Sequence, residues 1–69
     1  MEPKEIDNNF TYHSPKGDQQ LRYINIRSCA KTLAEMFNQF CPDSREKSLA
    51  MTKLEEAVMW ANASIARNE

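Results

Sequence analysis

The feature that most constrains this chain is its C-terminal part, where residues 43–67 show helical periodicity without a glycine or a proline. The stretch follows Pro42 and opens with a pattern typical of a helix start. Asp43 or Ser44 serves as the N-cap, and Glu46 follows in the first turn, as in a capping box. At 1.5 Å per residue such a helix is roughly 36 Å long. The rest of a 69-residue chain must therefore be built around this one helix.

Apolar residues recur on more than one side of this predicted helix. The main stripe consists of Leu49 or Ala50, Leu54, Ala57 or Val58, Ala61 and Ile65. Further apolar surface outside the stripe comes from Met51, Met59, Trp60 and Ala63. A single neighbouring helix covers one stripe and leaves the other surface in water. We therefore expect copies of this chain to associate through the helix.

Trp60 is open to two interpretations. It either covers the core within one chain or anchors an interface between subunits, where aromatic residues are enriched. The small residues Ala57, Ala61 and Ala63 would let another helix come close, which favours the interface.

Residues 18–40 predict a second helix, with Asp18 as its candidate N-cap. Its expected core-facing stripe consists of Leu21, Ile24, Ser28, Leu33, Phe37 and Phe40. Pro42 disfavours helical geometry at Cys41, so this helix should end near Phe40. The linker to the next helix is short, which predicts an antiparallel two-helix hairpin.

Residues 1–17 are polar and predict an extended or irregular arm. Residues 10–13 favour extended structure, and Pro15 with Gly17 should form a turn. The alternative is a disordered tail, but such tails are usually poor in aromatic residues and this arm has two. The predicted fold is a single all-α domain over residues 1–69, with the arm at 1–17, helices at 18–40 and 43–67, and a homo-oligomeric assembly.

The size of the chain also points to association. A domain this small is marginally stable and needs a disulfide, a metal or a partner. Cys29 and Cys41 would lie about 18 Å apart on one helix, too far for a disulfide bond. One histidine, His13, and two distant cysteines do not make a metal-ligand cluster. Association with other copies is the stabilising device that remains.

Charge and hydropathy limit the partners of the chain. The net charge is −1, whereas proteins that grip a DNA or RNA polymer usually carry a strong basic excess. No apolar run approaches the roughly 20 residues that span a membrane, and the first residues are too polar for a signal peptide. We expect a cytoplasmic protein whose anionic ligand, if it has one, is small.

The sequence has no pattern typical of an enzyme. A single glycine rules out a glycine-rich nucleotide loop, and Glu55-Glu56, as helical neighbours, point in different directions. We predict no catalytic residues, no metal and no cofactor.

The sequence does contain groups suited to binding a small nucleotide, because arginine binds phosphate through two parallel hydrogen bonds and tyrosine offers a stacking face. These groups are Tyr12, His13, Arg22, Arg27, Lys31, Arg45, Lys47 and Arg67. For Arg45 and Lys47, pairing with Asp43 and Glu46 is the simpler interpretation, and for Arg67 it is capping of the helix C-terminus.

The run from Cys41-Pro42-Asp43-Ser44-Arg45 through Trp60 to Arg67 resembles the signature of a phage protein family. That family comprises cyclic-oligonucleotide sponges, which block the CBASS immune system of bacteria. The further marks are Tyr12-His13-Ser14-Pro15, Ile26-Arg27 and Ala30-Lys31. The resemblance implies a helical protomer assembled as a homohexamer. It also implies that cyclic dinucleotides, such as cyclic GMP-AMP, and cyclic trinucleotides are sequestered uncleaved in separate pockets in the host bacterial cytoplasm.

The resemblance also implies roles for single residues. Tyr12 resembles the tyrosine that packs against the cyclic dinucleotide, and Arg27, beside Lys31, resembles the cation that reaches its phosphates from another protomer. The family has lysine at position 27, and arginine keeps the charge but changes the geometry. Arg67 resembles the arginine of the trinucleotide pocket, with Ser28 or Thr32 as its hydroxyl partner.

A different class of function is also compatible with the residues. In that alternative the chain is a structural or adaptor hairpin, which binds a host protein through Met51, Met59 and Trp60.

Overall fold

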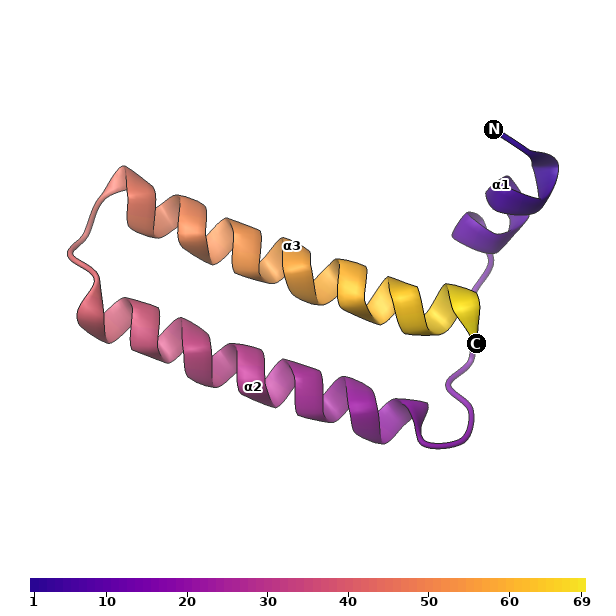
Figure 1. Ribbon diagram of the computed structural model, residues 1–69, viewed down its shortest axis with the longest axis horizontal. Helices are drawn as coiled ribbons and strands as arrows, with labels where there is room; N and C mark the ends of the chain where they lie inside the picture. The colour runs from indigo at the N-terminus through magenta and orange to yellow at the C-terminus, as the bar shows by residue number, and fades with distance from the viewer.

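The computed structural model describes residues 1–69 and contains three α-helices and no strand. The helices are α1 (Pro3–Phe10), α2 (Gln19–Phe40) and α3 (Arg45–Asn68). Helices α2 and α3 lie side by side as an antiparallel hairpin, and α1 stands beyond its open end (Figure 1). The predicted all-α class and the hairpin are confirmed. None of the helices is long and apolar enough to cross a membrane.

The turn between α2 and α3 follows local signals. Cys41 is extended, with φ −98° and ψ 133°, as a residue before proline prefers, and its N–H still donates to the carbonyl of Phe37 at 3.0 Å. Ser44 caps α3 by accepting a hydrogen bond from the backbone N–H of Lys47 at 3.1 Å. Of the two predicted caps, Ser44 is therefore the one used. Asp43 instead pairs with the Lys47 ammonium at 3.0 Å, which confirms the simpler interpretation of that cation.

The arm was predicted to be extended, and this is wrong for residues 3–10, which form α1. Pro3 lies in the first turn of the helix, where its missing N–H costs nothing, and Glu5 suits the positive end of the helix dipole. Proline there starts a helix rather than preventing one. Thr11 ends α1 in extended geometry, and a turn follows at Gly17, whose φ is +58°, as the sequence predicted.

The packing face of α3 was predicted correctly, and that of α2 was not. On α3 the half-buried residues include Ala50, Leu54, Val58, Ala61 and Ile65, which are members of the expected stripe. On α2, Leu21, Ile24, Leu33 and Phe40 are exposed, and Phe37 alone of the expected stripe is half-buried. The half-buried residues of α2 are Arg22, Tyr23, Ile26, Ala30, Ala34 and Phe37.

The hairpin has almost no interior. No hydrophobic residue is fully buried, and the only buried residue is Gln19, which is 5% exposed. The molecule measures 44 × 29 × 13 Å, so its shortest dimension is that of a single helix layer. Its accessible surface is 5716 Å². A compact monomer of the same mass would expose only about 4,450 Å².

Polar contacts close the open end of the hairpin. Arg22 donates two parallel hydrogen bonds to the carboxylate of Glu69, one of them at 2.8 Å from Nη1 to Oε2. The same arginine donates a hydrogen bond from Nε to the Asp18 carboxylate at 3.2 Å. The Asp18 side chain does not cap the backbone of α2, although the sequence predicted that it would. The side chain of Gln19 donates to Glu69 at 3.2 Å and accepts from the N–H of Lys16 at 3.1 Å. These contacts hold the first turn of α2 against the end of α3.

Candidate functional site

A concave surface lies at the open end of the hairpin, where the linker after α1 meets α2 and α3. This surface, called the hollow below, has a volume of about 450 Å³. That volume is within the range of small-molecule sites, about 300–1,000 Å³. Its lining residues come from the end of α1, the linker, α2 and α3, and they are Asn9, Thr11, Tyr12, His13, Tyr23, Arg27, Asn62, Ala63, Ala66 and Arg67.

The hollow carries positive charge in a chain whose net charge is −1. Arg27 and Arg67 line it, and no carboxylate does. Neither guanidinium forms an ion pair, whereas Arg22 is paired with Glu69 and Asp18. Unpaired guanidinium groups keep their donors available for the oxygens of a phosphate. The hollow therefore suits a small anion.

Two tyrosines add aromatic surface to the hollow. Tyr12 lies on the linker and is 82% exposed, so its ring is open to stacking. Tyr23 lies one helical turn before Arg27 on α2, and residues at this spacing share a face. Aromatic faces beside unpaired arginines can hold both the bases and the phosphates of a nucleotide.

Asn8 positions the linker that carries Tyr12. Its side-chain amide donates to the carbonyl of Arg67 at 3.1 Å, which joins α1 to the last turn of α3. Its own carbonyl accepts a hydrogen bond from Nε2 of His13 at 2.8 Å. These two bonds hold the residues on either side of Tyr12 next to the end of α3.

Asn62 contributes an unusual polar group to the hollow. Its Oδ1 atom is buried and has no hydrogen-bond partner. An unpaired buried acceptor costs about 1–3 kcal/mol.

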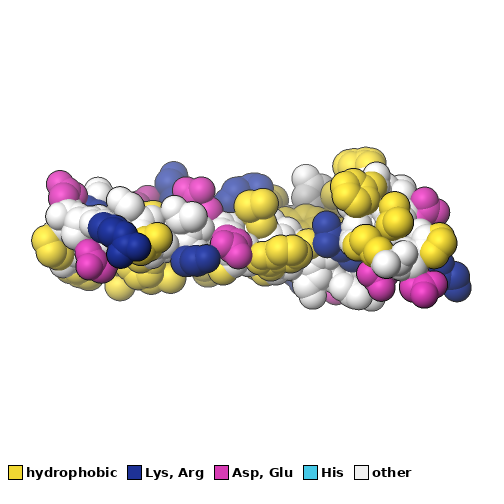
Figure 2. Space-filling view, turned by 90° about the horizontal axis from the view of Figure 1, so that it is seen from above, with side chains coloured by type: hydrophobic (Ala, Val, Ile, Leu, Met, Phe, Trp, Pro, Cys, Tyr) yellow, Lys and Arg dark blue, Asp and Glu magenta, His cyan; other side chains and the backbone are white.

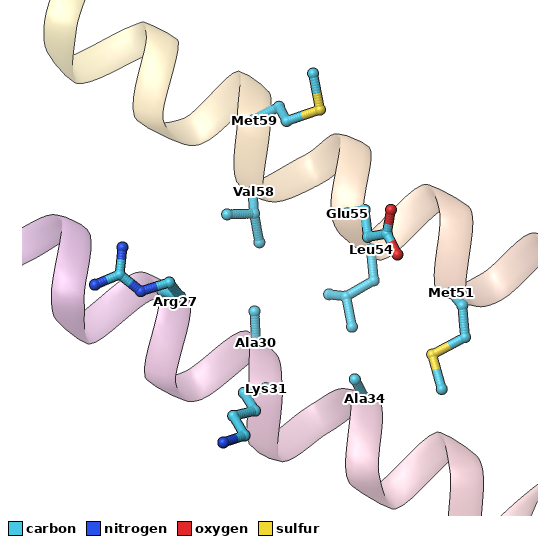
Figure 3. A pocket seen from close by; sticks show the side chains of 9 residues that line it. All are labelled: Arg27, Ala30, Lys31, Ala34, Met51, Leu54, Glu55, Val58 and Met59. Carbon is cyan, nitrogen blue, oxygen red and sulfur yellow. The ribbon is translucent and has the colours of Figure 1, made fainter.

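A second concavity adjoins the hollow and is called the groove below. It runs between α2 and α3, has a volume of about 480 Å³ and is mostly apolar. Ala30 and Ala34 point toward Val58 and Leu54 across it (Figure 3). Its lining residues are Arg27, Ala30, Lys31, Ala34, Met51, Leu54, Glu55, Val58 and Met59. Arg27 lines both concavities, so they meet at this residue.

The structure brings some of the predicted site residues together and separates others. Tyr12, Arg27 and Arg67 line the hollow of one protomer, although they were assigned to two different pockets. Lys31 lines the groove and not the hollow. Ser28 and Thr32 are exposed on α2 and line neither concavity, and the Thr32 hydroxyl donates to the carbonyl of Ser28 at 3.2 Å.

Sequence reasoning did not select several residues of the hollow. Tyr23 could have been found from its four-residue spacing to Arg27. Asn62 gave no such signal, because an asparagine inside a helix looks like a solvated position until its surroundings are known. Its place in the hollow depends on the way that α3 packs beside α2.

The comparisons with known proteins bear on this arrangement. Residues 2–66 match the family described as Acb2/Tad1, hairpin domain. The chain belongs to this family. Comparison with curated proteins and with solved structures gives no match. The Acb2/Tad1 family is that of the anti-CBASS cyclic-oligonucleotide sponges, so the resemblance found in the sequence is confirmed. It is a sequestering family and not a catalytic one. The chain has no group of three or more histidine, cysteine or acidic residues that could hold a metal ion.

Proposed function

We propose that this protein sequesters cyclic oligonucleotide second messengers without cleaving them, and so blocks CBASS immune signalling. The ligands are cyclic dinucleotides, such as cyclic GMP-AMP, and cyclic trinucleotides. The proposed place of action is the cytoplasm of the host bacterium, and no nucleic-acid polymer, membrane or cofactor takes part. Family membership supports the class of function.

The hollow is the observation that carries this proposal. It combines the unpaired guanidinium groups of Arg27 and Arg67 with the exposed ring of Tyr12. A cyclic oligonucleotide presents phosphates and bases on a closed ring, so these groups match its chemistry. The ligand is preorganised, which keeps the entropy cost of capture low.

Assembly into a homo-oligomer, a hexamer by family resemblance, is part of the proposal. Large apolar side chains that a compact monomer would bury are exposed here, and Trp60 is 62% exposed. This exposure favours the interface role for Trp60. Assembly would also multiply the few groups that each chain contributes to a ligand.

The site residues follow from this scheme. Tyr12, Arg27 and Lys31 are proposed to bind the cyclic dinucleotide. Arg67 is proposed to bind the cyclic trinucleotide with Ser28 or Thr32. Because Ser28 and Thr32 lie outside the hollow that Arg67 lines, these groups would meet only when protomers come together.

Calorimetry with the full chain tests the assignment. Tyr12→Ala and Arg27→Ala should weaken binding of cyclic GMP-AMP and spare a cyclic trinucleotide, and Arg67→Ala should do the reverse. We expect losses of about 10- to 100-fold for the arginines, because a hydrogen bond to a charged group contributes about 1.5–3 kcal/mol.

Lys53→Ala is the matched control, because it removes one cation from outside both concavities. It should leave both affinities unchanged. Equal losses of both ligands in every variant would contradict separate pockets. No heat signal with either ligand would contradict the sponge and favour an adaptor role. Recovery of a linear product after heat denaturation would show cleavage.

A further inference from the structure

The linker between α1 and α2 carries Tyr12 and has almost no backbone structure of its own. Residues 11–15 make no backbone–backbone hydrogen bond. The one hydrogen bond that any of these residues makes runs from Nε2 of His13 to the carbonyl of Asn8, at 2.8 Å. A single side chain therefore closes the loop from residue 8 to residue 13, and Tyr12 lies within this loop.

Helix α1, from which the loop starts, is not held to the hairpin by apolar packing. It has no buried residue, and Ile6 and Phe10 are 46% and 83% exposed. Figure 2 shows hydrophobic side chains at the surface over the end of the molecule where α1 lies. The only hydrogen bond that joins α1 to the hairpin is the one from the Asn8 amide to the carbonyl of Arg67, at 3.1 Å. Asn8 therefore fixes the start of the loop, and His13 ties the end of the loop to Asn8.

The carbonyl of Asn8 determines the role of the His13 ring. A carbonyl oxygen only accepts hydrogen bonds, so Nε2 of His13 carries the hydrogen and donates it. Asn8 and His13 are both half-buried, whereas Tyr12 between them is 82% exposed. The two ends of the loop are thus packed, and the tyrosine ring is left open to a ligand.

We propose that His13 is a positioning residue for Tyr12. The bond from its Nε2 to the carbonyl of Asn8 holds the loop in the conformation in which Tyr12 meets the cyclic dinucleotide. Without this bond the loop would have to be ordered during binding, and the entropy cost of fixing its backbone would weaken the affinity. This inference rests on the proposed function, because His13 acts on the ligand only through Tyr12.

Two substitutions of His13 separate its hydrogen bond from its ring. The amide nitrogen of glutamine lies about as far from the backbone as Nε2 of histidine, whereas that of asparagine is one methylene nearer. His13→Asn should weaken binding of cyclic GMP-AMP by about 3- to 10-fold, as expected for the loss of one ordinary hydrogen bond. His13→Gln should restore most of the affinity. Calorimetry with the full chain measures both.

A double-mutant cycle with Tyr12→Ala tests whether His13 acts through Tyr12. If the bond serves to position the tyrosine ring, His13→Asn has little further effect once that ring is removed. Equal losses in the presence and absence of the ring would mean that His13 contacts the ligand itself or supports the fold in general. Either result would overturn the positioning role.

A second measurement needs no ligand. Nuclear magnetic resonance relaxation of the backbone amides reports motion of the loop on the picosecond-to-nanosecond timescale. His13→Asn should increase the motion of the Tyr12 amide, and His13→Gln should not. Ser14→Ala is the matched control, because Ser14 is the next residue of the linker, makes no hydrogen bond and lines neither the hollow nor the groove. It should change neither the motion nor the affinity.

The outcomes separate this inference from the proposed function. An unchanged affinity or an unchanged Tyr12 amide in His13→Asn overturns the positioning role and leaves the sponge function standing. A loss that His13→Gln does not restore also overturns it, because the imidazole ring itself is then required. If the native chain does not bind cyclic GMP-AMP, the proposed function is contradicted, and relaxation still decides whether His13 holds the loop.

Discussion

The arginines of this chain differ in role because they differ in neighbours. Arg22 is held by Glu69 and Asp18 at the open end of the hairpin, and its pKa is raised above its usual value, chiefly by the hydrogen bonds to Glu69. Arg27 and Arg67 have no acidic partner. Its ion pairs make Arg22 a structural residue, whereas the guanidinium groups of Arg27 and Arg67 are available for a ligand.

The contact of Arg22 with Glu69 predicts a dependence of stability on pH. Hydrogen bonds from Arg22, and then from Gln19, lower the pKa of Glu69 from 4.5 to about 2. A lowered pKa in the folded state means that the ionised carboxylate stabilises the fold. This stabilisation is complete above about pH 4.5 and is lost as the pH falls through about 2.

Thermal unfolding followed by circular dichroism checks this prediction. The melting temperature is measured from pH 5 to pH 2 in steps of about half a unit. It should fall further for the native chain than for the Glu69→Gln variant. Equal losses in the two proteins would mean that the contact does not contribute to stability.

At the scale of single elements, α2 has apolar residues on more than one side, and the choice among them is not local. Its larger side chains, such as Leu33 and Phe40, remain exposed, while Ala30 and Ala34 face α3. The half-buried face of α2 combines these small residues with the larger Tyr23, Ile26 and Phe37, so side-chain size alone does not select it. Periodicity shows that a helix is amphipathic, but it does not show which of two apolar sides meets the partner helix.

The start of α3 depends on one hydroxyl. Ser44 accepts the hydrogen bond of the Lys47 N–H, so Ser44→Ala should lower the free energy of unfolding by about 1 kcal/mol. Ser44→Asp should retain most of the stability, because aspartate also caps helices well. Urea titration measures both. Ser48→Ala, which changes a serine in the same turn that is not the cap, should have a smaller effect than Ser44→Ala.

As a whole molecule, the protomer is one helix layer thick and buries no hydrophobic residue completely. Its radius of gyration is 15.2 Å. A compact domain of this length would have about 11 Å. Such a shape gives each side chain few neighbours, so one chain by itself buries little apolar surface, which supports the proposed assembly.

This shape predicts that thermal stability depends on protein concentration. Each tenfold rise in concentration favours an association step by about 1.4 kcal/mol, so the melting temperature should rise between about 1 and 100 µM protein. Scanning calorimetry or circular dichroism at several concentrations measures the shift. A melting temperature that stays constant over this range would indicate a self-sufficient monomer.

The hairpin was predictable because its signals are local. Pro42 ends α2, Ser44 starts α3, and the stripe through Leu54 repeats along α3, and each acts within one or two turns of the chain. The same locality misled the prediction for α1, where polar composition concealed a helix that begins at Pro3.

The hollow was not predictable in the same way. Tyr12, Arg27 and Arg67 are far apart in the sequence, and they line one surface only because α2 and α3 run antiparallel and Asn8 holds the linker against the end of α3. Residue types and spacing therefore determined the helices and the kinds of group available for binding. Packing between distant segments decided which of those groups meet. Contacts between residues far apart in the sequence produce no periodic pattern in the sequence, so they could not be predicted from it.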